Sequence, residues 1–298
     1  MGLFRTIFKG IAKVKVKKIM AVLVMSLGVL LSLYPFLSNF LYERSARAQV
    51  EYIREEAKHL KTETREKYLQ QANAYNEGLA EAKICFKDAF DGESSADKSA
   101  DKEEKYYETL AASSSRGLMG VLEIPSIGAE LPVYYGTSEE ILQKGIGHLK
   151  GSSIPTGRKG THAVLTGHTG LNKARLFTDL VMLQKGDLFF ITILNETLTY
   201  RVDQILVCLP EDTQALRIVP EEEYVTLVTC TPYGINDHRL LVRGTRTEYA
   251  KEINTQEKKK RQDSLWLESY KRALKIGGSL LLLLLLFFFL QKKLRRQK

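Results

Sequence analysis

Residues 224–245 read YVTLVTCTPYGINDHRLLVRGT, two apolar runs separated by a turn that contains Pro232 and Gly234. Runs of this kind on either side of a turn predict two antiparallel strands. Cys230 stands at the end of the first strand, where it can reach a surface groove, and Arg239 opens the second strand. A hairpin would therefore bring Arg239 back beside Cys230.

The same pattern of short apolar runs and turn signals extends over residues 117–249. Seven or eight short strands with one or two helical insertions predict a mainly β fold, a closed barrel. The expected strands are Val121–Ile124, Leu131–Tyr135, His162–Thr166, Leu188–Leu194, Leu198–Leu209, Tyr224–Cys230 and Arg239–Arg246. The expected helical insertions are Ser138–Lys144 and Leu176–Leu183. A segment of about 130 residues can bury one core of its own.

The motif TGHTG at residues 166–170 places His168 between two glycines, directly after an expected strand. Glycines let a backbone and a ligand approach closely, and an imidazole can move protons near neutral pH. A guanidinium at Arg239 would favour thiolate over thiol at Cys230 and could donate to a developing oxyanion. Taken singly, each residue also fits a structural role, as a small buried cysteine, a loop histidine or a solvated surface arginine.

The basic residues gather at the two ends of the chain. The formal net charge is +9, of which residues 1–18 carry +6 and residues 292–298 carry +5, so the segment between them carries −2. A nucleic-acid-binding domain needs a basic face on its folded body, so this distribution argues against one. We expect both basic tails to lie in the cytoplasm beside membrane spans.

Each basic tail adjoins an apolar run. Residues 19–42 contain no charged side chain, and these 24 residues would extend roughly 36 Å as a helix, enough for a hydrocarbon core of about 30 Å. Residues 276–291 form a run of 16 that spans if Lys275 and Lys292 reach the two interfaces. The first run could instead be a cleavable signal peptide with a site at residues 46–48, although its length favours an anchor. Two spans would anchor the chain in the cell membrane with the intervening residues outside the cell.

The segments that flank the expected barrel have a helical or a linker composition. Apolar residues recur at threes and fours over residues 43–87, which predicts a helix. Residues 91–105 are too polar to be buried and predict a mobile linker. Residues 250–275 predict a juxtamembrane helix. The extracellular part would thus consist of a helical and linker segment over 43–116, the barrel, and this helix.

The chain has three cysteines, Cys85, Cys208 and Cys230. An odd number outside the membrane leaves at least one without a partner in the chain, which suggests a reactive thiol. Cys208 lies within an expected strand and is expected in the core. No cluster of cysteine and histidine has zinc spacing, so we expect neither a metal nor a cofactor.

The sequence around Cys230 resembles the sortase family. TLVTC at residues 226–230 matches the family signature TLxTC, with a histidine upstream and an arginine shortly downstream. The flanking sequence is similar to class C sortases, which polymerise pilins in Gram-positive bacteria. The matching stretches are GVLEIP (120–125), LPVYYG (131–136), residues 137–149, LFTDL (176–180) and residues 224–245. The likeness covers residues 117–248, and a carboxyl-terminal span is typical of the class.

The resemblance implies a barrel with Cys230, His168 and Arg239 around one groove. Cys230 would attack the Thr–Gly bond of an LPxTG-like sorting motif and form a thioacyl intermediate. His168 would protonate the leaving amine and later help to deprotonate the incoming amine. Arg239 would orient the substrate carbonyl and stabilise the oxyanion. The incoming amine of a pilin polymerase is a lysine of the next pilin, so the implied partners are pilin subunits and the bilayer, with no nucleic acid and no metal.

Class C sortases also have a lid upstream of the barrel, with an Asp-Pro-aromatic motif over the cysteine. The matching region here holds Asp88, Ala89 and Phe90, so the proline is absent. We refer to Asp88 and Phe90 as the lid residues. The resemblance implies that Asp88 reaches Arg239 and that Phe90 covers Cys230, although without proline the lid would be less rigid. The structural alternative is an ordinary helix end.

Three other functions fit the same residues. A housekeeping sortase would attach surface proteins to a peptidoglycan amine, but the second span and the long segment before the barrel argue against it. A cysteine protease would let water resolve the thioester. A non-enzymatic membrane-anchored assembly factor would not depend on Cys230.

Overall fold

The structure of the chain is a computed structural model. It describes residues 2–82, 85, 86, 88, 90, 94, 95, 101–171, 174–248, 264, 268, 270–272, 274–279, 281–283 and 286. The chain divides into two compact units, which are treated separately. One consists of Met1–Tyr42, Asn172–Ala174 and Arg272–Lys298, and the other, which contains all strands of the described residues, consists of Glu43–Leu171 and Arg175–Lys271.

Eight strands close into a barrel in the order β10-β8-β7-β3-β4-β5-β6-β9. They are β3 (Leu118–Ile124), β4 (Ala129–Tyr135), β5 (Ile146–His148), β6 (Thr161–Thr166), β7 (Leu188–Ile193), β8 (Glu196–Cys208), β9 (Glu223–Thr231) and β10 (His238–Thr247). The pairs β4–β5 and β6–β9 are parallel, and the other neighbours are antiparallel. The predicted closed barrel of about eight strands is confirmed.

Two details of the barrel differ from the prediction. Strand β5 was not predicted, because its three residues, one of them Gly147, are too few to show the alternation of apolar and polar side chains. The insertion expected over Leu176–Leu183 is only a short 3-10 turn, η4 (Leu180–Met182). Leu176 has a φ of 40°, which no right-handed helix accommodates, and its buried side chain shows that core packing takes precedence there.

The core fills the barrel and extends beneath the segments that cover it. Phe189 and Tyr200 stack with ring centroids 5.4 Å apart and are both fully buried. Strand β6 is buried at every position, so both of its faces are covered. Strand β9 is buried from Val225 to Thr229 but only half-buried at Cys230. The end of β9 is therefore where the interior meets the surface.

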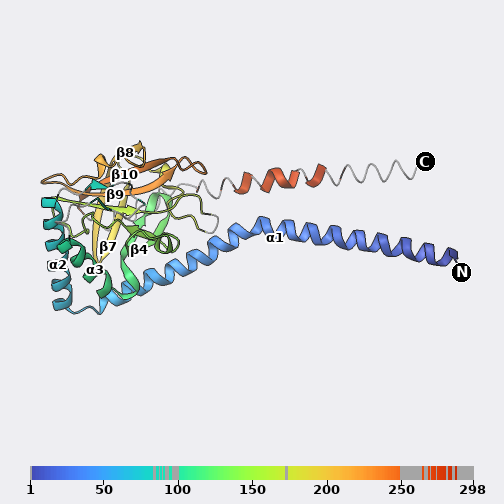
Figure 1. Cartoon of the computed structure of the whole chain (residues 1–298), viewed down its shortest axis with the longest axis horizontal. Helices are drawn as coiled ribbons and strands as arrows, with labels where there is room; N and C mark the ends of the chain where they lie inside the picture. The colour runs from blue at the N-terminus through green and yellow to red at the C-terminus, as the bar shows by residue number, and fades with distance from the viewer. Residues whose placement is uncertain are drawn as a thin grey trace. The chain divides into compact units, whose positions relative to one another are not determined.

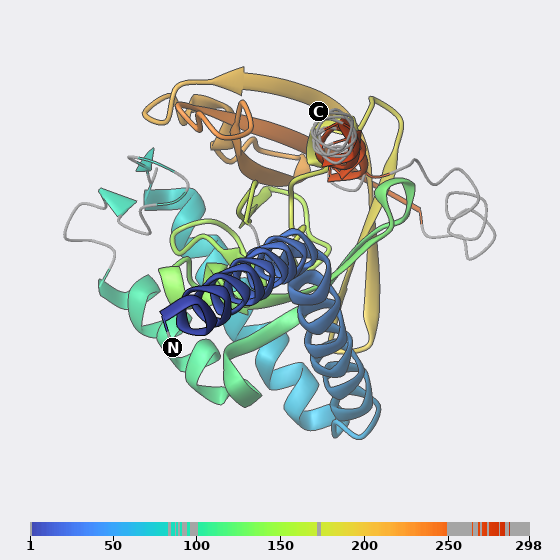
Figure 2. The ribbon, with the colours of Figure 1, turned by 90° about the vertical axis from the view of Figure 1, so that its right-hand side faces the viewer.

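Within the part of the chain that the structure describes, four α-helices with assigned bounds and several short elements lie outside the barrel, besides the helical residues near the carboxyl end. The helices are α1 (Gly2–Lys58), α2 (Thr62–Ala82), α3 (Asp101–Ser113) and α4 (Glu139–Leu142). The short strands β1 (Cys85–Phe86) and β2 (Ser94–Ser95) pair with each other, and 3-10 turns occur at η2 (Ser115–Gly117), η3 (Pro125–Ile127) and η5 (Gln214–Leu216). Helices α2 and α3 lie next to each other on one flank of the barrel (Figure 1, Figure 2).

The helix predicted over residues 43–87 is wrong as one element. It is broken between Lys58 and Thr62, where a second helix begins with the acidic Glu63 in its first turn, a start that the apolar spacing conceals. Ser94–Ser95 pairs with β1, so the linker predicted over 91–105 is wrong at this position.

The same linker prediction is also wrong from Asp101 onward, where α3 begins. The charged residues form only the first turns of this helix. Its anchoring side chains come later, at the buried Tyr107 and Leu110. The predicted linker ends at residue 105 and so does not include the two residues that hold the helix on the barrel.

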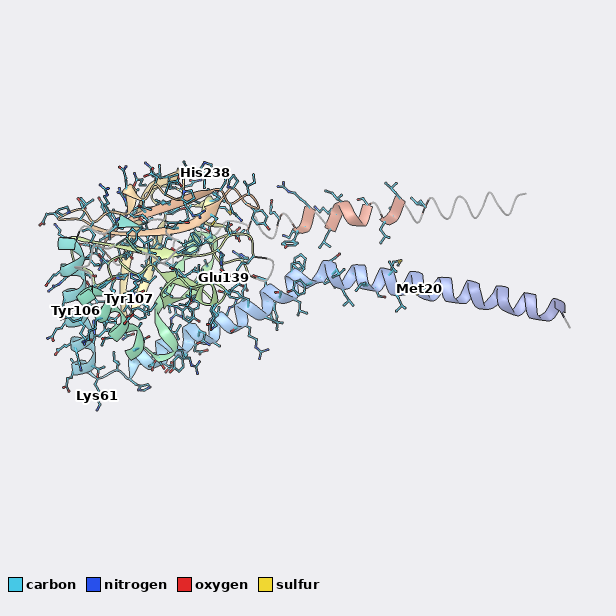
Figure 3. The ribbon with its side chains drawn as sticks, viewed as in Figure 1. Met20, Lys61, Tyr106, Tyr107, Glu139 and His238 are labelled. Carbon is cyan, nitrogen blue, oxygen red and sulfur yellow. The ribbon has the colours of Figure 1, made fainter. Side chains whose placement is uncertain are left out.

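Helices α2 and α3 are tied to the loops around β5. The Asn76 amide donates to the Ile154 carbonyl at 2.9 Å and accepts from the Ile154 N–H at 2.8 Å, so it imitates a strand neighbour. The Tyr75 hydroxyl accepts from the Gly151 N–H at 3.0 Å. The buried Tyr107 of α3, labelled in Figure 3, places its hydroxyl 3.0 Å from His148 Nδ1. These hydrogen bonds hold both helices against the loops around β5.

Among the described residues, one helical stretch, Leu23–Lys58, has the length and apolar composition to cross a membrane. A signal sequence near the N-terminus would meet the same criterion, so this is weak evidence for anchoring. The second predicted span, 276–291, lies partly outside the described residues, and those that are described are helical. Most of the predicted helix at 250–275 also lies outside them; Ser264 is not helical, whereas residues 270–272 are. The tail at 292–298 lies wholly outside.

Candidate active site

Strands β9 and β10 place Cys230 and Arg239 directly opposite each other. The antiparallel register pairs Arg239 with Cys230 on one side and with Cys208 of β8 on the other. Directly opposed side chains project from the same face of a sheet. The predicted hairpin is therefore confirmed, and the arginine has a cysteine on each neighbouring strand.

His168 reaches the same end of the barrel through the parallel pairing of β6 with β9, in which Thr166 stands opposite Val228. Beyond β6 the backbone is fixed on both sides. The Gly167 N–H donates to the Val228 carbonyl at 3.0 Å, and the Thr229 hydroxyl donates to the Gly167 carbonyl at 2.7 Å. His168 therefore follows a segment bonded to the two residues just before Cys230.

Gly167 has no room for a side chain. A Cβ there would lie 2.6 Å from Ile146 Cδ1 and 2.8 Å from Phe177 Cδ2. The Phe177 N–H in turn donates to the His168 carbonyl at 3.1 Å. The absence of a side chain at Gly167 thus lets the backbone pack closely against the core. This packing fixes the position of the His168 backbone relative to the core.

Asp88 is joined to Arg239 by a bidentate ion pair. Arg239 Nε donates to Asp88 Oδ1 at 3.0 Å and Nη2 donates to Oδ2 at 2.6 Å, and each side chain is only 12% exposed. The remaining nitrogen, Nη1, donates to the carbonyls of Asn236 and His238, both at 3.2 Å. All three guanidinium nitrogens are therefore occupied in this state.

Phe90 lies between the other two polar groups of the site. Its ring centroid is 5.9 Å from that of His168, and the Arg239 guanidinium carbon is 5.0 Å from the same ring. The Phe90 N–H donates to Asp88 Oδ1 at 3.3 Å, so the two lid residues also support each other. Aromatic and cation–π contacts of this kind are individually weak.

Phe86 anchors the lid residues from the amino-terminal side. It is 8% exposed and packs in a cluster with Cys208, Val228 and others. Its carbonyl accepts from the Thr213 hydroxyl at 2.8 Å. The cluster also contains Leu149, Val164, Leu216 and Leu241, with Phe90, Leu206 and Ala215 packed against it.

The closed arrangement disfavours a thiolate at Cys230. Burial raises the pKa of the Cys230 thiol, Arg239 lowers it, and the negative charge of Asp88 raises it again. The net direction is upward, so the group is a thiol here. The pKa of Cys208 is also raised, by burial and then by Asp212, which fits the core position predicted for it. The Cys85 side chain lies outside the described residues.

Reasoning from the sequence missed one polar neighbour of the site. Glu139, labelled in Figure 3, places Oε2 3.3 Å from His168 Nε2. Nothing in the spacing of the two residues indicates this contact, since it depends on how α4 packs. Within the described part of the chain, no group of three or more His, Cys, Asp or Glu residues is arranged to hold a metal ion.

Comparison with known proteins places this geometry in a family. Residues 122–247 match the sortase domain. Sortase D of Bacillus subtilis (strain 168) is 32% identical over 174 residues, which cover 56% of this chain and 82% of that protein.

Solved structures extend the likeness beyond the barrel. The crystal structure of sortase C-1 from Streptococcus pneumoniae is 40% identical with a TM-score of 0.60, and the match covers 68% of this chain and all (100%) of that one. Sortase C1 of GBS Pilus Island 1 is 37% identical with a TM-score of 0.61, covering 69% of this chain and 94% of that one. The chain therefore belongs to the sortase family, and it is a sortase transpeptidase whose structure matches class C sortases.

Proposed function

We propose that this sortase polymerises pilins, with Cys230 as nucleophile, His168 as general acid and base, and Arg239 as oxyanion donor. The observation that carries the proposal is the convergence of β6, β9 and β10, which brings all three side chains to one end of the barrel. The likeness to sortase C1 of a pilus island supports a pilin as the substrate. The lid residues over the site support regulated access by a large protein substrate.

The first step requires the lid residues to leave. The carboxylate of Asp88 occupies Nε and Nη2 of Arg239, where a substrate carbonyl oxygen would bind. Departure of Asp88 removes a negative charge that raises the pKa of Cys230, and it exposes the thiol to water. Both changes increase the thiolate fraction, and the thiolate is the nucleophile.

Acylation then follows at the threonine of an LPxTG-like motif. Cys230 Sγ attacks the carbonyl carbon, and the oxyanion that forms accepts hydrogen bonds from Arg239. The C–N bond to glycine breaks as His168 gives a proton to the leaving amine. The product is a thioester between Cys230 and threonine, with a free glycine amine on the released peptide.

In the second step, the acyl group is transferred to an amine, and His168 acts as a base instead of an acid. A lysine amine of the next pilin attacks the thioester carbonyl, neutral His168 accepts the proton that this amine loses, and Sγ leaves as thiolate. The result is an isopeptide bond, so one amide replaces another and no nucleotide is needed. We further propose that two membrane spans, 19–42 and 276–291, hold the barrel outside the cell with both ends in the cytoplasm.

The test is formation of a covalent pilin dimer by the full-length enzyme in detergent. One pilin domain carries the sorting motif and the other carries the acceptor lysine, and mass spectrometry locates the isopeptide. The matched control is Cys230→Ala. In a deletion strain, loss of pilus ladders with normal anchoring of other surface proteins supports the polymerase. Transfer to a peptidoglycan amine in preference to the pilin lysine would favour the housekeeping function instead.

A further inference from the structure

Glu139 is the first residue of α4, and its two carboxylate oxygens have different surroundings. Oε2 lies 3.3 Å from His168 Nε2, while Oε1 accepts from the Gln143 amide at 2.5 Å. The contact with His168 is an ion-pair distance without hydrogen-bond alignment in this closed state. Catalytic hydrogen bonds are often loose before substrate binds and tighten in the reacting complex.

The barrel itself sets the distance between these two residues. Helix α4 lies against β5, where a Cβ on Gly147 would come within 3.0 Å of Leu142 Cδ2 and 2.4 Å of the Gly136 carbonyl oxygen. Gly147 pairs with Thr166 of β6, two residues before His168. The missing side chain at Gly147 thus lets α4 approach the strand that leads into His168.

Glu139 differs in this respect from the lid residues. Phe90 packs on the His168 ring only while the lid is closed. Glu139 lies on α4 and bonds with Gln143, so its contact with His168 does not depend on the lid residues.

We propose that Glu139 is a positioning residue that orients His168 during catalysis, an inference that rests on the proposed function. A carboxylate at Nε2 favours the tautomer with its proton on that nitrogen, which leaves Nδ1 to exchange protons with the substrate amines. It also stabilises the imidazolium that forms in each half-reaction. A third group that orients the base is a recurrent feature of activated nucleophiles.

The exposure of Glu139 limits the size of the effect. Its side chain is 69% exposed, against 21% for His168, so water substitutes for part of the contact. General acid–base catalysis contributes about 10²–10⁴ in rate, and we expect loss of orientation to remove about tenfold of it.

The chain offers a matched control one residue away. Glu140 is also exposed, and it forms an ion pair with Lys144 at 2.5 Å, four residues on, as Glu139 bonds with Gln143. Glu139→Gln and Glu140→Gln therefore perturb the same turn of helix, and only the first changes a group beside His168. Glu139→Asp keeps the charge and should recover part of the lost rate.

The experiment measures sorting-peptide acylation and amine transfer by the full-length enzyme in detergent, with thermal unfolding as a folding check. We expect Glu139→Gln to lower kcat about tenfold in both half-reactions with KM changed by less than about twofold, and Glu140→Gln to match the parent. Nitrogen NMR of the imidazole, assigned with His168→Gln, should show Nε2 protonated in the parent and a tautomer mixture in Glu139→Gln.

Two results would overturn the inference. One is a kcat for Glu139→Gln equal to that of Glu140→Gln, and the other is a loss confined to KM for the amine, which would make Glu139 a substrate-binding group. Failure of the proposed function is distinct, because the parent enzyme itself would then show no acylation that depends on Cys230.

Discussion

Removal of either lid residue should speed alkylation of Cys230 by a small thiol reagent. The closed state rests on the bidentate pair between Asp88 and Arg239 and on the contacts of Phe90. Hydrogen bonds to charged groups contribute about 1.5–3 kcal/mol each in favourable cases, and a cation–π contact about 0.5–1 kcal/mol. When the lid residues leave, the Asp88 carboxylate and the Arg239 guanidinium are hydrated by water. This hydration offsets most of the stabilisation that their hydrogen bonds to each other provide.

The expected net preference for the closed state is therefore about 1–2 kcal/mol, since Ala89 also lacks the fixed φ of proline. When opening is fast, the alkylation rate is proportional to the open fraction. Loss of about 1.4 kcal/mol then raises the rate about tenfold. Phe90→Ala should give about this factor, because it improves access without removing a charge. Asp88→Ala should give more, because it also lowers the pKa of Cys230.

The assay uses full-length enzyme and follows each cysteine separately by peptide mass spectrometry, so Cys85 and Cys208 need not be replaced. Phe90→Leu keeps apolar volume and should lie between parent and Phe90→Ala. Glu140→Ala removes an exposed carboxylate that pairs with Lys144, and it controls for general charge effects. Alkylation rates for Phe90→Ala and Asp88→Ala within about twofold of the parent would show that these residues do not limit access.

Three further predictions test the chemistry and the stability of the barrel. Cys230→Ala should abolish the thioacyl adduct detected by mass spectrometry after incubation with sorting peptide, and an adduct on Cys85 or Cys208 would contradict the assignment. Arg239→Lys should lose about 10²–10³ in turnover, because an ammonium lacks the planar fork that meets an oxyanion, and a loss of less than about threefold would leave only a general charge effect. Burial lowers the pKa of both His148 and His162 to about 4, so each stays neutral in the folded state and charges more readily when unfolded. The stability they contribute is complete above about pH 6.5 and falls as the pH drops toward 4, by about 3 kcal/mol for each histidine. Urea unfolding measured from about pH 7 to 5 should show this fall, and a flat free energy of unfolding across that range would refute it.

The sequence predicts those parts of the site that depend on local pairing. Cys230 and Arg239 belong to one hairpin, so alternation and a turn suffice to bring them together. His168 is foreseen as a candidate from its glycines, but its place at the same end of the barrel as Cys230 depends on the parallel pairing of β6 with β9, which no local pattern specifies. Glu139 is harder still, because its contact depends on the absence of a side chain at Gly147.

The segments outside the barrel were predicted less well, because they too depend on contacts that local sequence patterns do not reveal. Helix α3 is held by Tyr107 on His148, a contact between residues far apart in the chain, while its first turns look like a linker. The pair β1–β2 has two residues in each strand, below the length at which periodicity is visible.

The anchoring of α2 and α3 has a consequence for competition at Arg239. In the sequence, Asp88 lies between two residues that are fixed by hydrogen bonds. Asn76 is bonded to Ile154, and Tyr107 is bonded to His148. The Asp88 carboxylate is thus an intramolecular competitor with an effective concentration, on the order of millimolar for a short tether, that dilution cannot lower. A free sorting peptide at micromolar concentration competes poorly with such a group. If the proposed spans hold the enzyme in the membrane, a substrate anchored in the same membrane would gain a comparable local concentration, and this would restore the balance.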